Sequence, residues 1–542
     1  MHATEPTLTT SMVVSWNAHA VQFIDPPVFD LLYLPGTKEF QARVVQGSAA
    51  WTVSSRAPRI DLATIWNRIA VRKFALELSW VDSHGKVLAV ETSARVKAPD
   101  FQGFAEPPMD WGAAADRASA YLMRVADSGR APYREPGVPV WIWSAASPCP
   151  VPTPESLGPG YRIADYRHYF EYRARIWPEG HGESYPGCIV PAIIYGMLAH
   201  AEARRSDAPT ALRLARAAGD WVLSHRLPES GALPLFPFST IARGRYFGGI
   251  EASSVNLLRA SWIALSLVRL TEGCGDAQYL EYARHIARIT AGFQAPDGSF
   301  PYRVDPSTGT IVEAFCTGAI QFTLLVDALA PYGIEAPLLM AAERALQWMA
   351  AYPAATRQWQ GGYEDIAESP PYRNLTHWEA QLLIWRLCRT RERDPSFIPL
   401  ARSVLRFVED QFVLFGPESE AHPVPVRGPL LFEQYLCWWP MEGHTGYYIH
   451  SLLELHAATG EPVFLEKAKA AANAICAQQF EDGSFSSWGT RWVNEGRTSG
   501  LDCGHTWYNM NAVASAALYR LDAYLHGQDL ASSPPGERAL AR

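Results

Sequence analysis

The sequence has no long apolar run and little charge of either sign. No hydrophobic segment reaches the roughly 20 uninterrupted residues that a membrane-spanning helix needs. Charged residues make up 19% of the chain and the formal net charge is −8, so the basic surface typical of nucleic-acid binding is not expected. We therefore predict a protein with neither a membrane nor a nucleic-acid partner.

Signals for secretion and for metal binding are missing as well. The first residues, MHATEPTLTT, lack a basic segment followed by an apolar one, which is the mark of a secretory signal. Eight cysteines occur without a CxxC pair, which argues against a disulfide framework or a zinc ribbon. The HExxH spacing of zinc enzymes is also absent. We expect a cytoplasmic protein with reduced thiols, no cofactor and no metal.

Aromatic and other apolar residues, by contrast, are abundant. Hydrophobic residues make up 48% of the chain, enough for a large globular core, and there are 19 Trp and 23 Tyr. Such rings provide flat apolar platforms with polar edges, which suit sugar rings.

The first hundred residues are rich in short β-type segments. Turn residues separate them, for example DPP at 25–27, PGT at 35–37 and DSHG at 82–85. This pattern predicts a small β-sandwich of the immunoglobulin or fibronectin type at 1–100, followed by a linker at 101–110. The expected strands are 13–16, 20–23, 40–45, 50–53, 71–80, 87–90 and 92–96.

From residue 111 the hydrophobic period becomes helical, and the sequence repeats internally. Segment 279–300 aligns without a gap with 464–485, so that Gln294 matches Gln479 and two DGSF tetrads coincide. Weaker copies begin near Leu212, Leu339 and Ile398, which gives spacings of 59 to 68 residues. A period of this size fits two helices per repeat and stacked helical hairpins.

Twelve helices in six hairpins predict a mainly α fold, an (α/α)6 barrel at 111–526 with a tail at 527–542. Alternate helices would line its inside. The expected helices are 111–128, 188–205, 209–226, 252–272, 276–293, 314–331, 335–352, 375–391, 395–414, 444–459, 461–479 and 506–526.

The hairpin period, the QxxDGSF turns and the β domain before the toroid resemble the six-hairpin glycosidase superfamily. That group includes glycoside hydrolases, polysaccharide lyases and sugar epimerases, and the resemblance implies an (α/α)6 toroid that acts on carbohydrate. The turns also resemble those of terpenoid cyclases, but the DxDD acid motif of those enzymes is absent.

Long connections precede every second helix, and they hold the unusual polar and aromatic residues. Because the inner helices of such a ring run in one direction, their first residues should meet at one end, where helix N-termini favour hydroxyls and carboxylates. Binding residues also concentrate on loops that a rigid scaffold positions. The long connections are 129–187, 227–251, 294–313, 353–374, 415–443 and 480–505.

Two chemistries fit these loops. Glycoside hydrolysis needs two carboxyl groups across the scissile bond, and the candidates are Glu183, Glu379, Glu442 and Asp502. Each could instead cap a helix. The alternative is proton abstraction next to a uronate carboxylate, giving a lyase or an epimerase. A third alternative is a toroid that binds carbohydrate without catalysis. Candidates for proton abstraction are His377, His444, His505 and Tyr447.

The leading hypothesis is a glycoside hydrolase that acts on an oligosaccharide, including one with a uronic acid. The sequence leaves the sugar, the linkage and the oligomeric state open. Further side chains on the same loops are predicted to bind the substrate. These are His181, Tyr185, Arg245, Glu251, Tyr363, Asp365, Asn374, Trp438, Trp439, Tyr448, Trp492, Trp507 and Tyr508.

Overall fold

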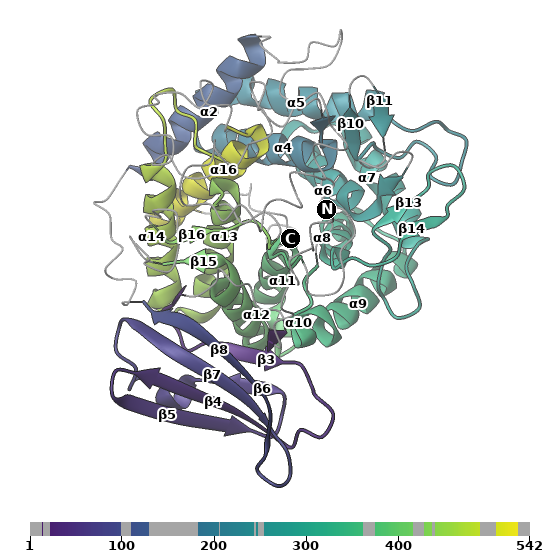
Figure 1. The fold of residues 1–542 in the computed structure, drawn as a ribbon. Helices are drawn as coiled ribbons and strands as arrows, with labels where there is room; N and C mark the ends of the chain where they lie inside the picture. The colour runs from purple at the N-terminus through teal and green to yellow at the C-terminus, as the bar shows by residue number, and fades with distance from the viewer. Residues whose placement is uncertain are drawn as a thin grey trace, which may run out of the picture.

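The computed structural model places most of the chain in a helical ring with a β domain beneath it (Figure 1). In residues 13–14, 127–128, 183–184, 240–242 and 245–247 only the backbone is described. None of the helices within the described ranges has the length and apolar character needed to cross a bilayer. The described ranges are 13–14, 22–98, 110–128, 183–204, 206–242, 245–247, 254–360, 374–415, 428–435, 440–487 and 506–528.

Six helices form a closed inner ring in which each helix contacts the next, and the last, α16, packs against the first, α4 (Figure 1). These helices are buried on nearly every side, and in all of them except α11 the apolar residues show little helical periodicity. The inner helices are α4 (Pro186–Ala203), α6 (Leu257–Cys274), α8 (Ala319–Leu329), α11 (Trp378–Arg389), α13 (Glu442–Thr459) and α16 (Tyr508–Leu525).

Six outer helices surround this ring, and five of them pack against the inner helix that they follow in the sequence. The first outer helix, α2, instead packs against the last inner helix, α16. Outer helices bury one face only; in α7 the buried Tyr279, Ala283, Ile286 and Thr290 recur every three or four residues. The outer helices are α2 (Trp111–Ser128), α5 (Ala208–Ser224), α7 (Ala277–Ala291), α9 (Ala336–Ala351), α12 (Phe397–Phe412) and α14 (Pro462–Ala477). The predicted helical ring and its twelve helices are therefore confirmed.

The repeated QxxDGSF turns connect neighbouring outer helices. Gln294 donates from Nε2 to the backbone oxygen of Ala341 in α9, at 2.8 Å. At the same position of the second copy, Gln479 donates to the backbone oxygen of Ala114 in α2, also at 2.8 Å. Since α14 is the last outer helix and α2 the first, the second copy joins the two ends of the toroid.

Replacing Gly483 in the second turn by alanine should destabilise the ring closure. Gly483 has a φ of +95°, and an added Cβ would lie 2.3 Å from the backbone oxygen of Arg117 in α2. We expect the free energy of unfolding, measured in urea, to fall by about 2–3 kcal/mol. Gly460→Ala is the control, because φ is +71° there but nothing lies within 4 Å of the new Cβ. It should cost about 1 kcal/mol; equal losses would contradict a role in ring closure.

The described residues of the first hundred, 13–14 and 22–98, form two sheets, and their core is separate from that of the ring. One sheet has the order β2-β8-β7-β4-β5 and the other β1-β3-β6. Two predicted strands, 87–90 and 92–96, are one continuous strand, β8, and strands β3 and β6 were not predicted. The immunoglobulin or fibronectin type stays a prediction. The strands are β1 (Val13–Val14), β2 (Gln22–Phe23), β3 (Val28–Leu31), β4 (Glu39–Gln46), β5 (Ala49–Ser55), β6 (Arg59–Asp61), β7 (Lys73–Val81) and β8 (Val87–Lys97).

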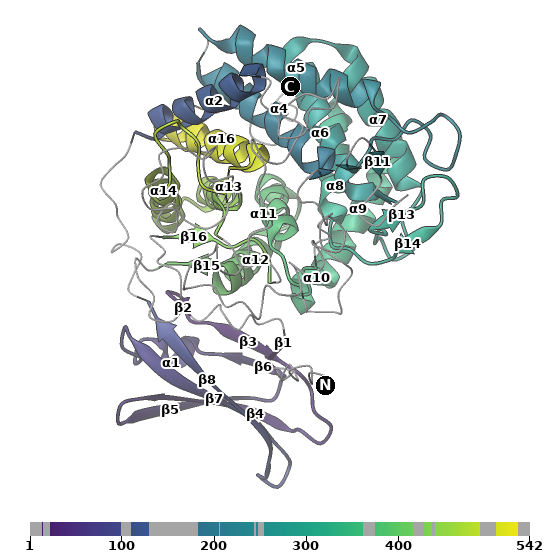
Figure 2. The same ribbon diagram turned by 45° about the horizontal axis from the view of Figure 1, so that its top comes forward.

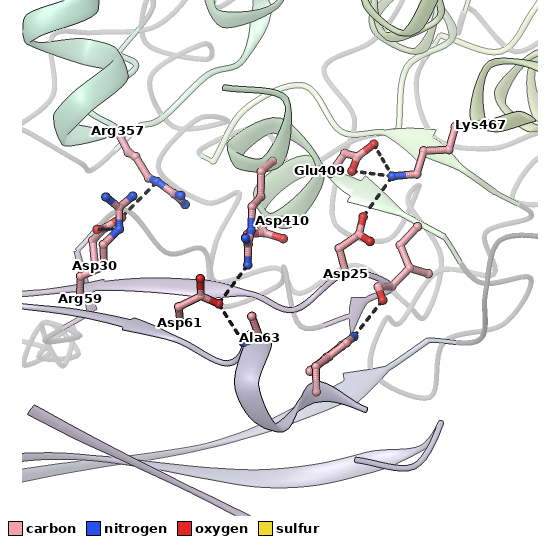
Figure 3. A network of polar contacts seen from close by, with 12 residues as sticks. Asp25, Asp30, Arg59, Asp61, Ala63, Arg357, Glu409, Asp410 and Lys467 are labelled. Atoms are coloured by element: carbon pink, nitrogen blue, oxygen red, sulfur yellow. Dashed lines mark hydrogen bonds and ion pairs between the residues drawn. The ribbon is translucent and has the colours of Figure 1, made fainter. Parts of the chain in front are cut away.

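Charged side chains join the β domain to the ring on the side of α12 and α14 (Figures 2 and 3). Lys467 of α14 lies with Nζ 2.9 Å from Glu409 Oε2 of α12 and 3.1 Å from Asp25 Oδ2 of the β domain. A second pair joins Arg357 to Asp30 of β3 at 3.2 Å. Lys467 and Glu409 are both buried, so this junction depends on their charges being matched.

The C-terminal ends of three inner helices are joined by another buried charge cluster. Glu454 of α13 accepts hydrogen bonds from Arg389 of α11 at 2.9 Å and from Arg520 of α16 at 2.6 Å. Burial alone would raise the pKa of Glu454, but the two guanidinium groups outweigh it and lower that pKa to about 2. An ionic cluster of one carboxylate and two guanidinium groups therefore lies at this end of the ring.

Candidate active site

A pocket opens among the first residues of five inner helices, α4, α6, α11, α13 and α16. Rings of Trp and Tyr make up much of its wall, and a few polar groups point to the same space. Its aromatic and polar lining residues are Tyr185, Arg259, Trp262, Trp378, Glu433, His444, Tyr447, Trp507 and Asn509.

The beginnings of the helices position these side chains. Tyr185 directly precedes α4 and Trp507 directly precedes α16. Trp378 is the first residue of α11, and Arg259 and His444 are the third residues of α6 and α13. Helices packed side by side in one direction therefore bring residues from distant parts of the sequence to one end of the ring.

His444 is the imidazole of the pocket wall. It is 2% exposed, and its ring centre lies 4.8 Å from that of His377 in an edge-on contact. Burial, and then the positive charge of Arg259, lower the pKa of His444 to about 3. The ring is therefore neutral near pH 7 and has a nitrogen lone pair that can accept a proton.

His377 lies behind His444, outside the pocket wall. The side-chain amide of Gln381, one turn further along α11, lies 2.7 Å from its Nδ1. With the amide nitrogen of Gln381 as the donor, Nδ1 is the acceptor, and the ring hydrogen of neutral His377 is on Nε2. Burial, and then His444, keep the pKa of His377 well below its usual range. His377 is thus a neutral ring with a fixed orientation.

Arg259 and Tyr447 complete the polar side of the pocket. The guanidinium of Arg259 lies 4.1 Å from the ring centre of Trp378. Asn256, the residue before α6, accepts a hydrogen bond from the backbone N–H of Arg259 at 3.2 Å, which fixes the start of that helix. Tyr447 stands one turn after His444, with ring centres 6.3 Å apart. Burial raises the pKa of Tyr447, so its phenol keeps its proton.

Glu442, a predicted catalytic acid, is fully buried next to the pocket and not in its described lining. Its Oε1 accepts hydrogen bonds from Ser487 at 2.5 Å and from Asn511 at 3.0 Å. Ser487 in turn accepts from the backbone N–H of Trp507 at 2.9 Å. Burial raises the pKa of Glu442 to about 7, so a substantial fraction of it holds a proton at neutral pH.

Two other predicted residues, Glu379 and Asn374, also lie outside the described pocket lining. Glu379, in the first turn of α11, accepts a hydrogen bond from the side chain of Thr376 at 3.2 Å. Asn374 donates to the side chain of Gln434 at 2.8 Å. Both contacts hold the loops in front of α11.

Tyr448 and Tyr508 lie outside the described lining of the pocket, so their role in binding the substrate stays a prediction. Tyr448 points to the outer side of α13, where its hydroxyl donates to Glu409 at 2.6 Å. Tyr508 is fully buried; burial, and then its neighbour Tyr121 of the outer helix α2, raise its pKa. In both cases the helix is rotated so that the neighbouring residue, Tyr447 or Trp507, takes the pocket position.

Several predicted residues have no described side chain. Glu183 and Arg245 are known only as backbone, in strands β9 (Glu183–Ser184) and β11 (Arg245–Phe247), which both pair with β10 (Thr240–Ala242). In the described part of the chain, no three His, Cys, Asp or Glu side chains are grouped as a metal ion would require. The predicted residues outside the described ranges are His181, Glu251, Tyr363, Asp365, Trp438, Trp439, Trp492, Asp502 and His505.

The pocket residues that were not predicted as site residues from the sequence include Arg259, Trp262 and Trp378. The predicted helix 252–272 put Arg259 in its second turn, whereas α6 begins only at Leu257. The sequence did contain a signal for Arg259 as a site residue, because this lone arginine interrupts the apolar first turns of an inner helix. A buried charge in such a place calls for a specific reason.

No protein-family model and no curated protein sequence matches the chain. Solved structures do match it. Cellobiose 2-epimerase from Spirochaeta thermophila matches at a TM-score of 0.50 and 11% identity, over 76% of this chain and 97% of the epimerase. A family 76 glycoside hydrolase from a bovine Bacteroides thetaiotaomicron strain matches at 0.47 and 10%, over 93% and 98%. An unsaturated glucuronyl hydrolase specific for heparin matches at 0.47 and 11%, over 78% and 99%.

Identities this low establish the fold alone. The inner helices follow one another around the ring, and the match to the epimerase structure agrees with that order. The chain has an (α/α)6 toroid fold.

Proposed function

We propose that this protein is a carbohydrate-processing enzyme whose reaction takes place in the pocket at the leading ends of the inner helices. Three indoles, Trp262, Trp378 and Trp507, and two phenols, Tyr185 and Tyr447, contribute to the pocket wall. Such rings stack on the apolar faces of sugars, and their polar edges contact hydroxyl groups. Few convergent polar groups among many aromatic ones are typical of a small-molecule site.

The chemistry that the described residues support best is proton transfer to and from a sugar carbon, as in an epimerase, an isomerase or a lyase. The observation that carries this proposal is the neutral imidazole of His444 on the pocket wall, one helical turn from the protonated phenol of Tyr447. His444 would accept the proton from carbon, and Tyr447 would donate to an oxygen of the same sugar. His444 and Tyr447 are both uncharged before the reaction, so neither of them carries a buried charge before the proton is transferred.

Glycoside hydrolysis is the second candidate, and Glu433 favours it. This carboxylate is part of the pocket wall, 5% exposed. Hydrolysis needs a second carboxyl group across the scissile bond. Glu442, with a pKa of about 7, has the protonation that a general acid needs, and Glu183 and Asp502 stay further proposals for this role.

Solvent-deuterium exchange distinguishes the two reactions. The full chain would be incubated in D2O with a panel of aldoses, disaccharides and uronates and followed by proton NMR. We expect one sugar to lose a C–H signal as deuterium enters at carbon, with a new epimer, ketose or C=C product. New reducing ends without deuterium at carbon would establish the hydrolase instead. If no sugar in the panel binds or reacts, the proposed function is wrong.

A further inference from the structure

Asn509, the second residue of α16, carries a buried carboxamide on the wall of the proposed site. It is 6% exposed and belongs to the pocket lining. Within the described part of the chain, no donor lies within hydrogen-bond distance of its Oδ1. A buried carbonyl oxygen without a donor is costly, so such a group calls for an explanation. Its place in the pocket lining points to a donor that arrives with a ligand.

Apolar side chains from α16 and α4 surround this part of the wall. One turn further along α16 the lining continues with Val513, and Met510 is the next residue after Asn509. The helix α4, which packs against α16, contributes Ala192. None of these three side chains has a hydrogen to donate. A hydrogen bond from a ligand to Asn509 would therefore be made in an apolar setting, where it is strengthened.

Asn511, two residues further along α16, is a carboxamide with a structural role. Its Nδ2 donates to Glu442 Oε1 and to the backbone oxygen of Trp507, each at 3.0 Å, and its Oδ1 accepts from the backbone N–H of Phe485 at 2.7 Å. Asn511 therefore connects α13, α16 and the turn before them. The oxygen of Asn509 makes no such contact among the described residues, so a role in holding the fold does not account for it.

The ligand group that suits Oδ1 is a neutral donor, and in a sugar that group is a hydroxyl. A carboxylate has no hydrogen to donate and would repel the carbonyl oxygen. A hydroxyl can donate to Oδ1, and the next hydroxyl on the sugar ring can accept from the amide nitrogen. Sites that pair with a substrate hydroxyl reject analogues without it, because the protein group is then left buried and unpaired.

We propose that Asn509 is a specificity-determining residue whose Oδ1 accepts a hydrogen bond from one hydroxyl of the sugar, so that the protein rejects the deoxy sugar at that position. The inference rests on the proposed function, and it names a group that the substrate must carry. Since α16 packs against α13, which carries His444 and Tyr447, this hydrogen bond would also orient the sugar toward those two residues.

Calorimetric titration of the full chain tests the proposal. The panel above, with D-glucose, D-mannose, cellobiose and D-glucuronate among its members, first gives the sugar that binds most tightly, and the monodeoxy derivatives of that sugar follow. For the unmodified protein we expect one deoxy position at which binding weakens at least about ten-fold. Asn509→Leu keeps a similar volume without the amide. In this variant the parent sugar should bind about ten-fold more weakly, and the penalty at that one position should disappear while those at the other positions stay.

Thermal unfolding without sugar gives a second readout. Asn509→Leu removes a buried oxygen that has no described donor, so the melting temperature should stay the same or rise. Asn511→Leu is the matched contrast on the same helix, because it breaks the hydrogen bonds described above, and its melting temperature should fall. A comparable fall in Asn509→Leu, or failure of that variant to fold, would show that the carboxamide is structural and would overturn the inference.

The binding outcomes separate the inference from the proposed function. If every deoxy penalty persists in Asn509→Leu, or if no deoxy position weakens binding to the unmodified protein, Asn509 does not select a hydroxyl, but a carbohydrate enzyme remains. If no sugar of the panel binds, the inference and the proposed function are both wrong.

Discussion

Replacement of His444 by asparagine should lower turnover of the exchanged sugar about 10²–10⁴-fold while the protein stays folded. The imidazole is the proton acceptor that we propose, and asparagine fills a similar volume without a basic nitrogen. The ring of His444 packs edge-on against His377, so its loss is also expected to change the stability slightly. Rates under single-turnover conditions, with thermal melting alongside, would separate lost chemistry from lost fold.

The matched control is His456→Asn on the same helix. His456 lies in the last turn of α13, at the opposite end from the pocket, with Nδ1 2.6 Å from the hydroxyl of Tyr524. Its replacement should change turnover less than about two-fold, since it lies far from the reacting atoms. Full turnover in His444→Asn would rule out the proton-transfer mechanism.

The pH profile gives an independent check on His444. An ordinary histidine becomes protonated below about pH 6.5 and would lose its function as a base there. Because burial and Arg259 lower the pKa of His444 to about 3, its basic form should persist well below that point. The acid limb of kcat/KM, which reports the free enzyme, should therefore appear clearly below pH 6.5.

Replacement of Lys467 by methionine should destabilise the protein by about 3–5 kcal/mol. Lys467 Nζ lies within 3.0 Å of both oxygens of Glu409, and both residues are buried. Methionine leaves that carboxylate without its cation and also removes the contact to Asp25 of the β domain. Thermal and urea unfolding would measure the loss.

Two further variants test the cause. Lys469→Met lies on the same helix, but its pair with Glu466 is largely exposed, so it should cost less than about 1 kcal/mol. Glu409→Gln combined with Lys467→Met removes both charges and should recover much of the stability.

The effect of Lys467→Met should also depend on pH. Burial raises the pKa of Glu409, and loss of Lys467 would raise it further. Protonation would then relieve the unpaired charge, so the stability difference from the unmodified protein should shrink as the pH falls. A difference that is constant with pH would show that packing, and not charge, holds the junction.

Local sequence patterns were sufficient for the number and approximate bounds of the helices. Apolar residues at a helical period, glycine after the helices and a repeated DGSF turn are short-range features, and they predicted all twelve ring helices. The internal repeat also indicated a ring, because identical hairpins must bury their apolar faces against one another. The β domain was predicted less well, since β3 and β6 lack a strong alternating pattern.

The composition of the pocket was predicted only in part, and Tyr447 and Tyr448 illustrate the reason. Adjacent residues on a helix point about 100° apart, so one of them can face the pocket while the other packs outward. A helix that is buried on all sides has no polar face to reveal its rotation, and α13 is such a helix. The sequence therefore put both tyrosines in the site, Tyr447 for proton abstraction and Tyr448 for binding, but the structure places Tyr447 at the pocket and Tyr448 on Glu409.

The sequence by itself determined that this protein is a ring of helical hairpins with its polar and aromatic residues in the loops before the inner helices. Only the tertiary structure decided which of them meet. Arg259, Trp378 and His444 are far apart along the chain, and they come together because the inner helices α6, α11 and α13 have their first turns at the same end of the ring. The rotation of each helix depends on its neighbours in the ring, and no local pattern encodes it.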